Sequence, residues 1–112
     1  MDNLAFKVLC LSFEEATEQP HFEKTSFRVN KKIFATLNIK KNSATLKLSA
    51  INQSVFCAFD PGKIKPATGA WGKQGWTLFE ISELKDEMII DALSLSYCSV
   101  APQKLSEKYS KD

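Results

Sequence analysis

The chain has 112 residues, of which 44% are hydrophobic and 25% are charged, and its formal net charge is +2. These values are typical of a globular protein, and we expect residues 1–112 to form one domain around a single core. No apolar run reaches the roughly 18–20 residues of a membrane span, and the acid Asp2 near the start argues against a secretory signal peptide. We therefore expect no association with a membrane.

The charge is unevenly distributed along the chain. Residues 1–23 carry a net charge of −4 and residues 80–112 carry −3, whereas residues 24–79 carry +9 because Asp60 is their only acid. The bases of this central block are Lys24, Arg28, Lys31, Lys32, Lys40, Lys41, Lys47, Lys63, Lys65 and Lys73. Such a block is typical of a surface that binds a polyanion, but exposed lysines also keep sheets soluble and protect their edges. Both interpretations stay open at this point.

The three cysteines, Cys10, Cys57 and Cys98, have apolar neighbours and no CxxC spacing. This pattern predicts buried, reduced thiols in a cytoplasmic protein and excludes a zinc ribbon or thioredoxin motif. The single histidine, His21, falls in a polar segment and is predicted to lie at the surface. Because no GxSxG motif occurs and the adjacent carboxylates do not form an acid–base pair, the sequence predicts neither an enzyme nor a metal or cofactor site.

The first predicted element is an amphipathic helix over residues 3–12. Its apolar stripe contains Leu4, Val8 and Leu11 at helical spacing. A polar exit segment follows the helix, and Pro20 disfavours any continuation of helix through the preceding residue.

The pattern changes at residue 25, where β-branched and aromatic residues become frequent. Residues 25–29 and 32–39 predict a hairpin that turns at Asn30-Lys31, since asparagine tolerates a positive φ. Alternation of apolar and polar residues over 44–49 predicts a third strand with one buried face.

A short helix is predicted over residues 50–59, where Ile51, Val55 and Phe59 recur at helical spacing. The lysine-rich segment that follows alternates like a strand. Because Pro66 cannot donate a backbone hydrogen bond, this strand belongs at a sheet edge or at a strand end.

The last third of the chain predicts a strand at 76–81 and then the longest helix, which reaches about residue 100. Ser82 is the expected N-cap of this helix, with acids in the first turn. One face of the helix is expected to carry Leu84, Met88, Ala92 and Leu95, flanked by Ile89, Leu93 and Tyr97. The polar tail over about 106–112 is expected to be frayed.

This order of elements defines an α+β domain with an antiparallel sheet and helices packed on one of its faces. The basic central block then corresponds mostly to the sheet, and the acidic ends correspond mostly to the helices.

The segment GAWGKQGW at 69–76 combines three glycines with both tryptophans of the chain. Its glycine spacing resembles a phosphate-binding loop, but such a loop must lead into a helix, whereas a strand is predicted to follow. A hairpin-like turn is the better interpretation, with Lys73 at its tip and Gly75 supplying a positive φ. Trp71 and Trp76 would flank this turn, either packed on the protein or available to stack on bases.

Four segments, SFRVNKKIFATL, ATLKLS, KIKPATGAWGKQGWTLFEI and SLSYCSVAPQKL, occur in an order that resembles the MmcQ/YjbR family. Members typically show a phenylalanine-valine hairpin strand, a (G/N)-K-x-F-A second strand, a G-W turn into a strand and an S-Y-x-x-V-A ending. The resemblance covers about residues 4–105. Ser12-Phe13 departs from the Leu-Pro that many members have after the first helix.

The resemblance implies a CyaY-like α+β fold and, by structural analogy with a double wing, DNA binding. Iron binding, which the CyaY-like fold suggests, is not carried over because the sequence shows no cluster of carboxylates with histidine.

We predict from these observations a non-specific DNA-binding protein that uses a lysine-rich sheet and its hairpin tips. The residues expected to contact double-stranded DNA or another polyanion are Arg28, Lys31, Lys32, Lys40, Lys41, Lys47, Lys63, Lys65, Lys73 and Trp71. Lysine reads base edges poorly compared with arginine, so little sequence specificity is expected, and a monomer is favoured.

The alternative is a module that binds a protein or a small ligand in an apolar groove around Trp71 and Trp76, with no role in nucleic-acid binding. Large exposure of both indoles, with lysines scattered over several faces, would favour this alternative. A third possibility, an enzyme whose site is assembled from dispersed residues, would require a polar pocket.

Overall fold

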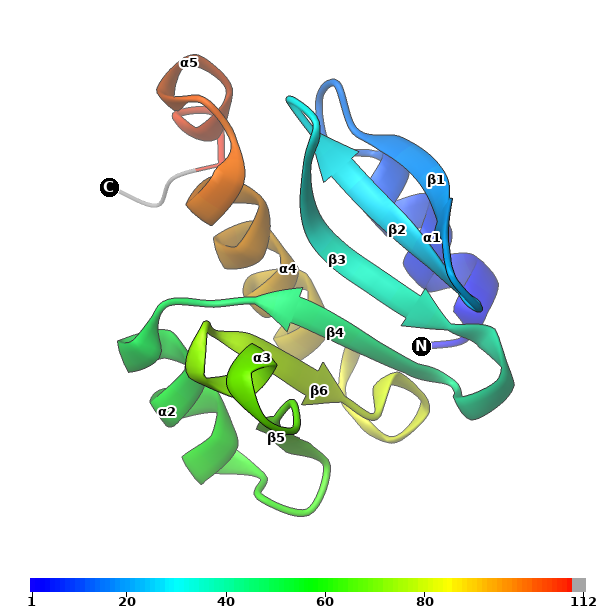
Figure 1. Cartoon of the computed structure of the whole chain (residues 1–112), viewed down its shortest axis with the longest axis vertical. Helices are drawn as coiled ribbons and strands as arrows, with labels where there is room; N and C mark the ends of the chain where they lie inside the picture. The colour runs from blue at the N-terminus through cyan, green and yellow to red at the C-terminus, as the bar shows by residue number, and fades with distance from the viewer. Residues whose placement is uncertain (110–112) are drawn as a thin grey trace.

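The computed structural model describes residues 1–109 and contains a six-stranded sheet in the order β1-β2-β3-β4-β6-β5, in which every neighbouring pair is antiparallel (Figure 1). The strands are β1 (Thr17–His21), β2 (Lys24–Val29), β3 (Lys32–Asn38), β4 (Ser43–Lys47), β5 (Ile64–Pro66) and β6 (Trp76–Phe79). The helices are α1 (Asn3–Leu11), α2 (Ala50–Phe59), α3 (Ala70–Lys73), α4 (Asp86–Val100) and α5 (Gln103–Ser106). The predicted α+β class is therefore confirmed.

The helices α1 and α4 pack on one face of the sheet and leave the middle of the other face open (Figure 1). The core between these layers contains Phe6 and Cys10 of α1, Phe27 and Leu46 of the sheet, and Tyr97 of α4. No helix within residues 1–109 is both long and apolar enough to cross a membrane.

Several local predictions from the sequence are confirmed. The β2–β3 hairpin turns at Asn30 and Lys31, whose φ angles are 52° and 67°. The helix over 50–59 has the predicted bounds, and the side chain of Ser49 caps it by accepting a hydrogen bond of 3.1 Å from the Asn52 amide. Pro66 ends the edge strand β5, where its missing donor costs nothing.

The segment predicted as a polar exit is instead the edge strand β1. It pairs with β2 from Thr17 opposite Arg28 to His21 opposite Lys24. Its residues are mostly exposed, so the strand has no apolar alternation, and Pro20 is tolerated because the strand lies at the sheet edge. Backbone pairing with β2 forms this strand where the side-chain pattern does not predict one.

The apolar stripe predicted for the first helix faces solvent. Leu4, Val8 and Leu11 are exposed, whereas Phe6 and Cys10, one turn apart on the other side, are buried. The Phe6 ring meets the Phe27 ring edge-on, with 6.1 Å between centroids. An aromatic ring fills the space above the sheet better than the aliphatic stripe does, which decides the orientation of α1.

The apolar stripe of α2 also faces outward. Ile51, Val55 and Phe59 are 77%, 61% and 72% exposed, and the helix contains no fully buried residue. Because α2 lies beside the sheet edge and not over its centre, only Phe56 and Cys57 pack partly against the core.

The longest helix begins later than predicted, at Asp86, because Ile81–Glu83 forms a separate 3₁₀ turn (3₁₀ being the tighter helix type). Ser82 is therefore not its N-cap. Ala92 is buried as predicted, but the rest of the buried face runs through Ile89, Leu93 and Tyr97, the positions expected to flank it, whereas Leu95 is exposed.

The end of the chain is anchored as far as Tyr109, although the tail was expected to be frayed from about residue 106. The Tyr109 ring packs against the Phe13 ring, with 4.9 Å between the ring centroids. The Tyr109 hydroxyl accepts a hydrogen bond of 3.0 Å from the backbone amide of Glu14. Tyr97 donates to the Glu14 carbonyl at 2.7 Å, and burial raises the pKa of Tyr97 to about 12, so this donor is present at neutral pH. Residues 110–112 lie outside the described residues.

Ser96 connects α4 to an irregularity in the sheet. The register of β2 and β3 shifts after Phe27, which leaves Phe34 as an extra residue in β3. The Ser96 hydroxyl, fully buried, donates to the Phe34 carbonyl and accepts a hydrogen bond of 2.9 Å from the Lys47 amide. One side chain thus satisfies two backbone groups that the bulge would otherwise leave unpaired.

We expect Ser96→Ala to lower the free energy of unfolding by about 2–3 kcal/mol, because it leaves a buried donor and a buried acceptor without partners. Urea denaturation measures this loss. Ser94→Ala on the same helix is the matched control, since Ser94 bonds only to the Ile90 carbonyl within the helix. Equal effects of the two substitutions would contradict the bridging role of Ser96.

Candidate functional site

The open face of the sheet is identified from the strand register. Side chains directly opposite one another across a strand pair point to the same side of the sheet. Phe27 and Ala35 form one such pair on the core side, so their neighbours Arg28 and Ile33 point to the open side. The same reasoning assigns to this face the pairs Thr36–Thr45, Lys47–Trp76 and Lys65–Leu78.

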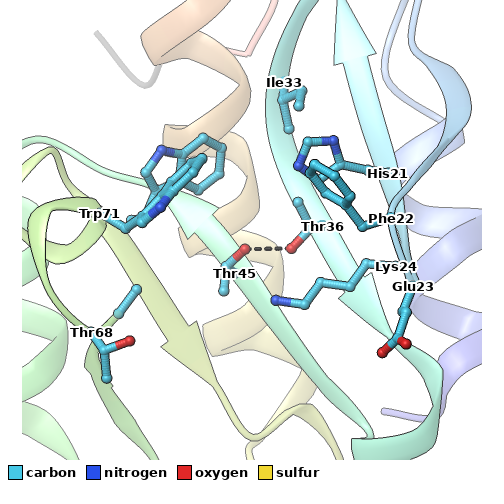
Figure 2. Close-up of a pocket in the computed structure, with 11 residues that line it drawn as sticks. His21, Phe22, Glu23, Lys24, Ile33, Thr36, Thr45, Thr68 and Trp71 are labelled. Atoms are coloured by element: carbon cyan, nitrogen blue, oxygen red, sulfur yellow. Dashed lines mark hydrogen bonds between the residues drawn. The ribbon is translucent and has the colours of Figure 1, made fainter.

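A cleft of about 600 Å³ lies on this open face (Figure 2). It is lined by the β1–β2 turn, by β3 and β4, and by the segment from β5 to β6. The lining residues are His21, Phe22, Glu23, Lys24, Ile33, Thr36, Thr45, Ala67, Thr68, Trp71 and Trp76. Most of the exposed lining area is apolar, as is typical of sites that bind organic ligands, although six of the eleven lining residues are polar or charged.

Aromatic rings form two walls of the cleft. On one wall Trp71 packs against Trp76 with centroids 6.0 Å apart; on the other the rings of His21 and Phe22 are 4.9 Å apart (Figure 2). Trp71 is 57% exposed and Phe22 is 95% exposed, whereas Trp76 is 9% exposed. Trp76 is buried without belonging to the hydrophobic core, because Trp71 and the Lys47 side chain cover it on the open side of the sheet.

The segment 69–76 displays Trp71 from a single turn of helix, α3, and not from the hairpin-like turn that we predicted. Two glycines allow it to pack closely. A Cβ on Gly72 would lie 2.1 Å from the Ala67 carbonyl oxygen, and a Cβ on Gly75, at φ +102°, would lie 2.0 Å from that of Leu48. The side-chain amide of Gln53, in α2, donates a hydrogen bond of 3.0 Å to the Gly72 carbonyl. The prediction that this segment leads into a strand is confirmed by β6. A phosphate-binding loop would instead lead into a long helix.

The predicted cationic residues are divided among three places. Arg28, Lys47 and Lys65 lie on the open face, as expected. Lys63 immediately precedes β5, and Lys73 lies in α3 beside Trp71.

Four of the predicted cations lie at the two hairpin tips. Lys31 and Lys32 lie at the β2–β3 connection and Lys40 and Lys41 at the β3–β4 connection, at opposite ends of β3 (Figure 1). Seven residues of strand place these tips roughly 20 Å apart. The two tips therefore occupy separate places at the two ends of this strand.

The cations of the central block keep their charge available. Within residues 1–109 the ion pairs join Lys7 to Glu18, Lys108 to Glu14, and the N-terminal ammonium group to Asp86. None of these involves a cation of the central block. Lys47 donates to the Gln74 carbonyl and lies 5.8 Å from the Trp76 ring centroid, which holds it beside the cleft. Glu23 is the one acid among the residues that line the cleft.

Of the eleven lining residues only Trp71 and Trp76 were predicted as part of a site, and those that were missed include His21, Phe22, Lys24, Thr36 and Thr45. His21 and Phe22 belong to the strand and turn that the sequence did not indicate. Phe22 adopts a φ of 58°. A glycine or asparagine at this position would have indicated such a turn from the sequence, but a phenylalanine does not. The two threonines occupy ordinary strand positions, and only the sheet register places them side by side, hydrogen-bonded through their hydroxyls.

Other kinds of chemistry have little support in the described residues. Within residues 1–109 no group of three or more His, Cys, Asp or Glu side chains is arranged to hold a metal ion. Cys10 is buried and the other two thiols are partly buried, and burial raises the pKa of all three, which disfavours nucleophilic thiolates.

The fold and the site define an α+β domain with an aromatic cleft on one open sheet face that also carries several cations. The chain belongs to the YjbR family, whose model matches residues 11–99. The predicted resemblance to the MmcQ/YjbR family is thereby confirmed. No curated protein matches the chain.

A solved structure with the same fold is that of protein DR2400 from Deinococcus radiodurans, which has a DUF419 domain. It is 17% identical in sequence, with a TM-score of 0.79 over 96% of this chain and 87% of DR2400. At this level of identity the likeness establishes the fold.

Proposed function

We propose that this protein binds nucleic acid through its phosphate groups, without sequence specificity, on the open face of the sheet. The observation that carries the proposal is that Lys24, Arg28, Lys47 and Lys65 share that face with exposed aromatic rings. Proteins that bind nucleic acid without reading its sequence combine such a cationic surface with rings on which bases stack.

Our proposal gives the cations of the open face a larger role than those of the hairpin tips. Double-wing binding would use both hairpin tips, which lie at opposite ends of β3, whereas the cations of the open face lie beside exposed aromatic rings. The open face therefore replaces the tips as the main contact surface in our proposal. Lys31, Lys32, Lys40 and Lys41 then contribute to long-range attraction of the polyanion.

The salt dependence of binding tests this proposal. With about four phosphates neutralised, a plot of log K against log salt concentration should have a slope of about −3. Fluorescence anisotropy of a labelled oligonucleotide measures this slope. A slope near zero, or no binding at low salt, would contradict the proposal.

A second candidate function is favoured by the cleft itself, whose volume and mainly apolar lining suit a small organic ligand or an apolar protein side chain. The two indoles differ in exposure, however, and the cations border the same cleft. This candidate predicts quenching of Trp71 fluorescence by an uncharged aromatic compound, with no binding of nucleic acid at low salt.

A further inference from the structure

We infer that the cleft accepts one unpaired base, so that the preferred ligand is single-stranded nucleic acid and not a duplex. This inference rests on the proposed function and makes it more specific. It depends on three features of the cleft. These are its exposed rings, the hydroxyl groups of Thr36 and Thr45 that form its floor, and the position of the cations around it.

Two rings on opposite walls are available to a planar ligand. Trp71 and Phe22 extend toward the same space from different parts of the chain, and both are more than half exposed (Figure 2). Phe22 is held outward by a turn with φ 58°, a costly conformation for a bulky side chain. This exposure leaves ring surface on which a base could stack, and a base can stack only when its own face is free.

The floor of the cleft offers hydrogen bonds that fit any base. Thr36 and Thr45 are hydrogen-bonded to each other, and their hydroxyls lie between the two aromatic walls (Figure 2). A hydroxyl both donates and accepts, so this pair can serve donor or acceptor groups on a base edge. The floor thus adds polar contacts without selecting one base.

The cations are positioned to hold the phosphates on either side of such a base. Lys24 lines the cleft, Arg28 is paired with the lining residue Ile33, and Lys47 is paired with the lining residue Trp76. Positive charge therefore borders the cleft at several points around the rings. In a duplex the bases are stacked on one another and their edges are paired, so none could enter the cleft without unpairing.

The test compares a short oligothymidine with an abasic oligomer of the same length and charge, and with a duplex of equal length, by anisotropy at low salt. We expect oligothymidine to bind about tenfold more tightly than the abasic oligomer and to quench Trp71 fluorescence. Trp71→Ala and Phe22→Ala should each reduce this ratio severalfold, because each removes a ring available for stacking and leaves the phosphate-binding cations in place. Phe59→Ala, which removes an exposed ring outside the cleft, should leave both affinities unchanged.

The outcomes separate the inference from the proposed function. Equal binding of oligothymidine and the abasic oligomer would overturn the inference and leave phosphate binding supported. Tighter binding of the duplex than of the single strand would also overturn it. Binding of none of the three at low salt would overturn both the inference and the proposed function.

Discussion

Gly75→Ala is expected to destabilise the protein by about 3–4 kcal/mol, a large share of the roughly 5–15 kcal/mol that holds a domain of this size folded. Two costs combine at this position. The φ angle of +102° is one that alanine rarely adopts, and a Cβ would lie 2.0 Å from the Leu48 carbonyl oxygen. The neighbouring backbone cannot easily move away, because the Leu48 amide donates to the Gly75 carbonyl at 2.9 Å.

Thermal and urea denaturation measure this loss, and a fall in melting temperature of at least about 12 °C is expected. Gly62→Ala is the matched control, since Gly62 has no positive φ and its nearest atom would be Asp60 Oδ1 at 3.9 Å. It should change stability by less than about 0.5 kcal/mol. Comparable stability of the two variants would mean that the connection between α3 and β6 is not packed as described.

Reversing three charges on the open face should reduce nucleic-acid affinity at low salt by at least about 100-fold. The variant combines Lys24→Glu, Arg28→Glu and Lys65→Glu. Each substitution replaces a cation that neutralises a phosphate with an anion that repels one, so the salt slope should also fall in magnitude by about 2. Anisotropy titrations at several salt concentrations measure both quantities.

A variant with the same change in net charge separates direct contact from general attraction. Lys32→Glu, Lys40→Glu and Lys41→Glu reverse three charges at the hairpin tips, and we expect this variant to lose less than about tenfold in affinity. Equal losses would show that only net charge matters. A larger loss at the tips would favour the double-wing mode of binding over the open face.

Local patterns in the sequence are sufficient to predict most of the elements, because the signals for them are local. The Asn30-Lys31 turn, the helix over 50–59 and the strand end at Pro66 each depend on a few neighbouring residues. The family resemblance, confirmed over residues 11–99, depends on such segments in order. Two exceptions are β1, whose residues carry no pattern of their own and form a strand through pairing with β2, and α3, for which a hairpin-like turn was predicted.

The orientation of the helices could not be predicted, because each apolar helix has more than one plausible face. In α1 the stripe containing Leu4 and Val8 looks as suitable for burial as Phe6 and Cys10. The space above the sheet, lined by large rings such as Phe27, selects between them. In the longest helix the same choice between two apolar faces buries the one that contains Tyr97 and leaves Leu95 exposed.

The sequence by itself determined the α+β class, the family and the concentration of positive charge in residues 24–79. The tertiary structure alone decided where that charge can act, because cross-strand register, and not order along the chain, sets which side chains share a face. It placed Trp71 opposite Phe22, put Thr36 beside Thr45 as the floor between them, and separated the two hairpin tips. The cleft exists because residues more than 40 positions apart in the chain meet on one side of the sheet.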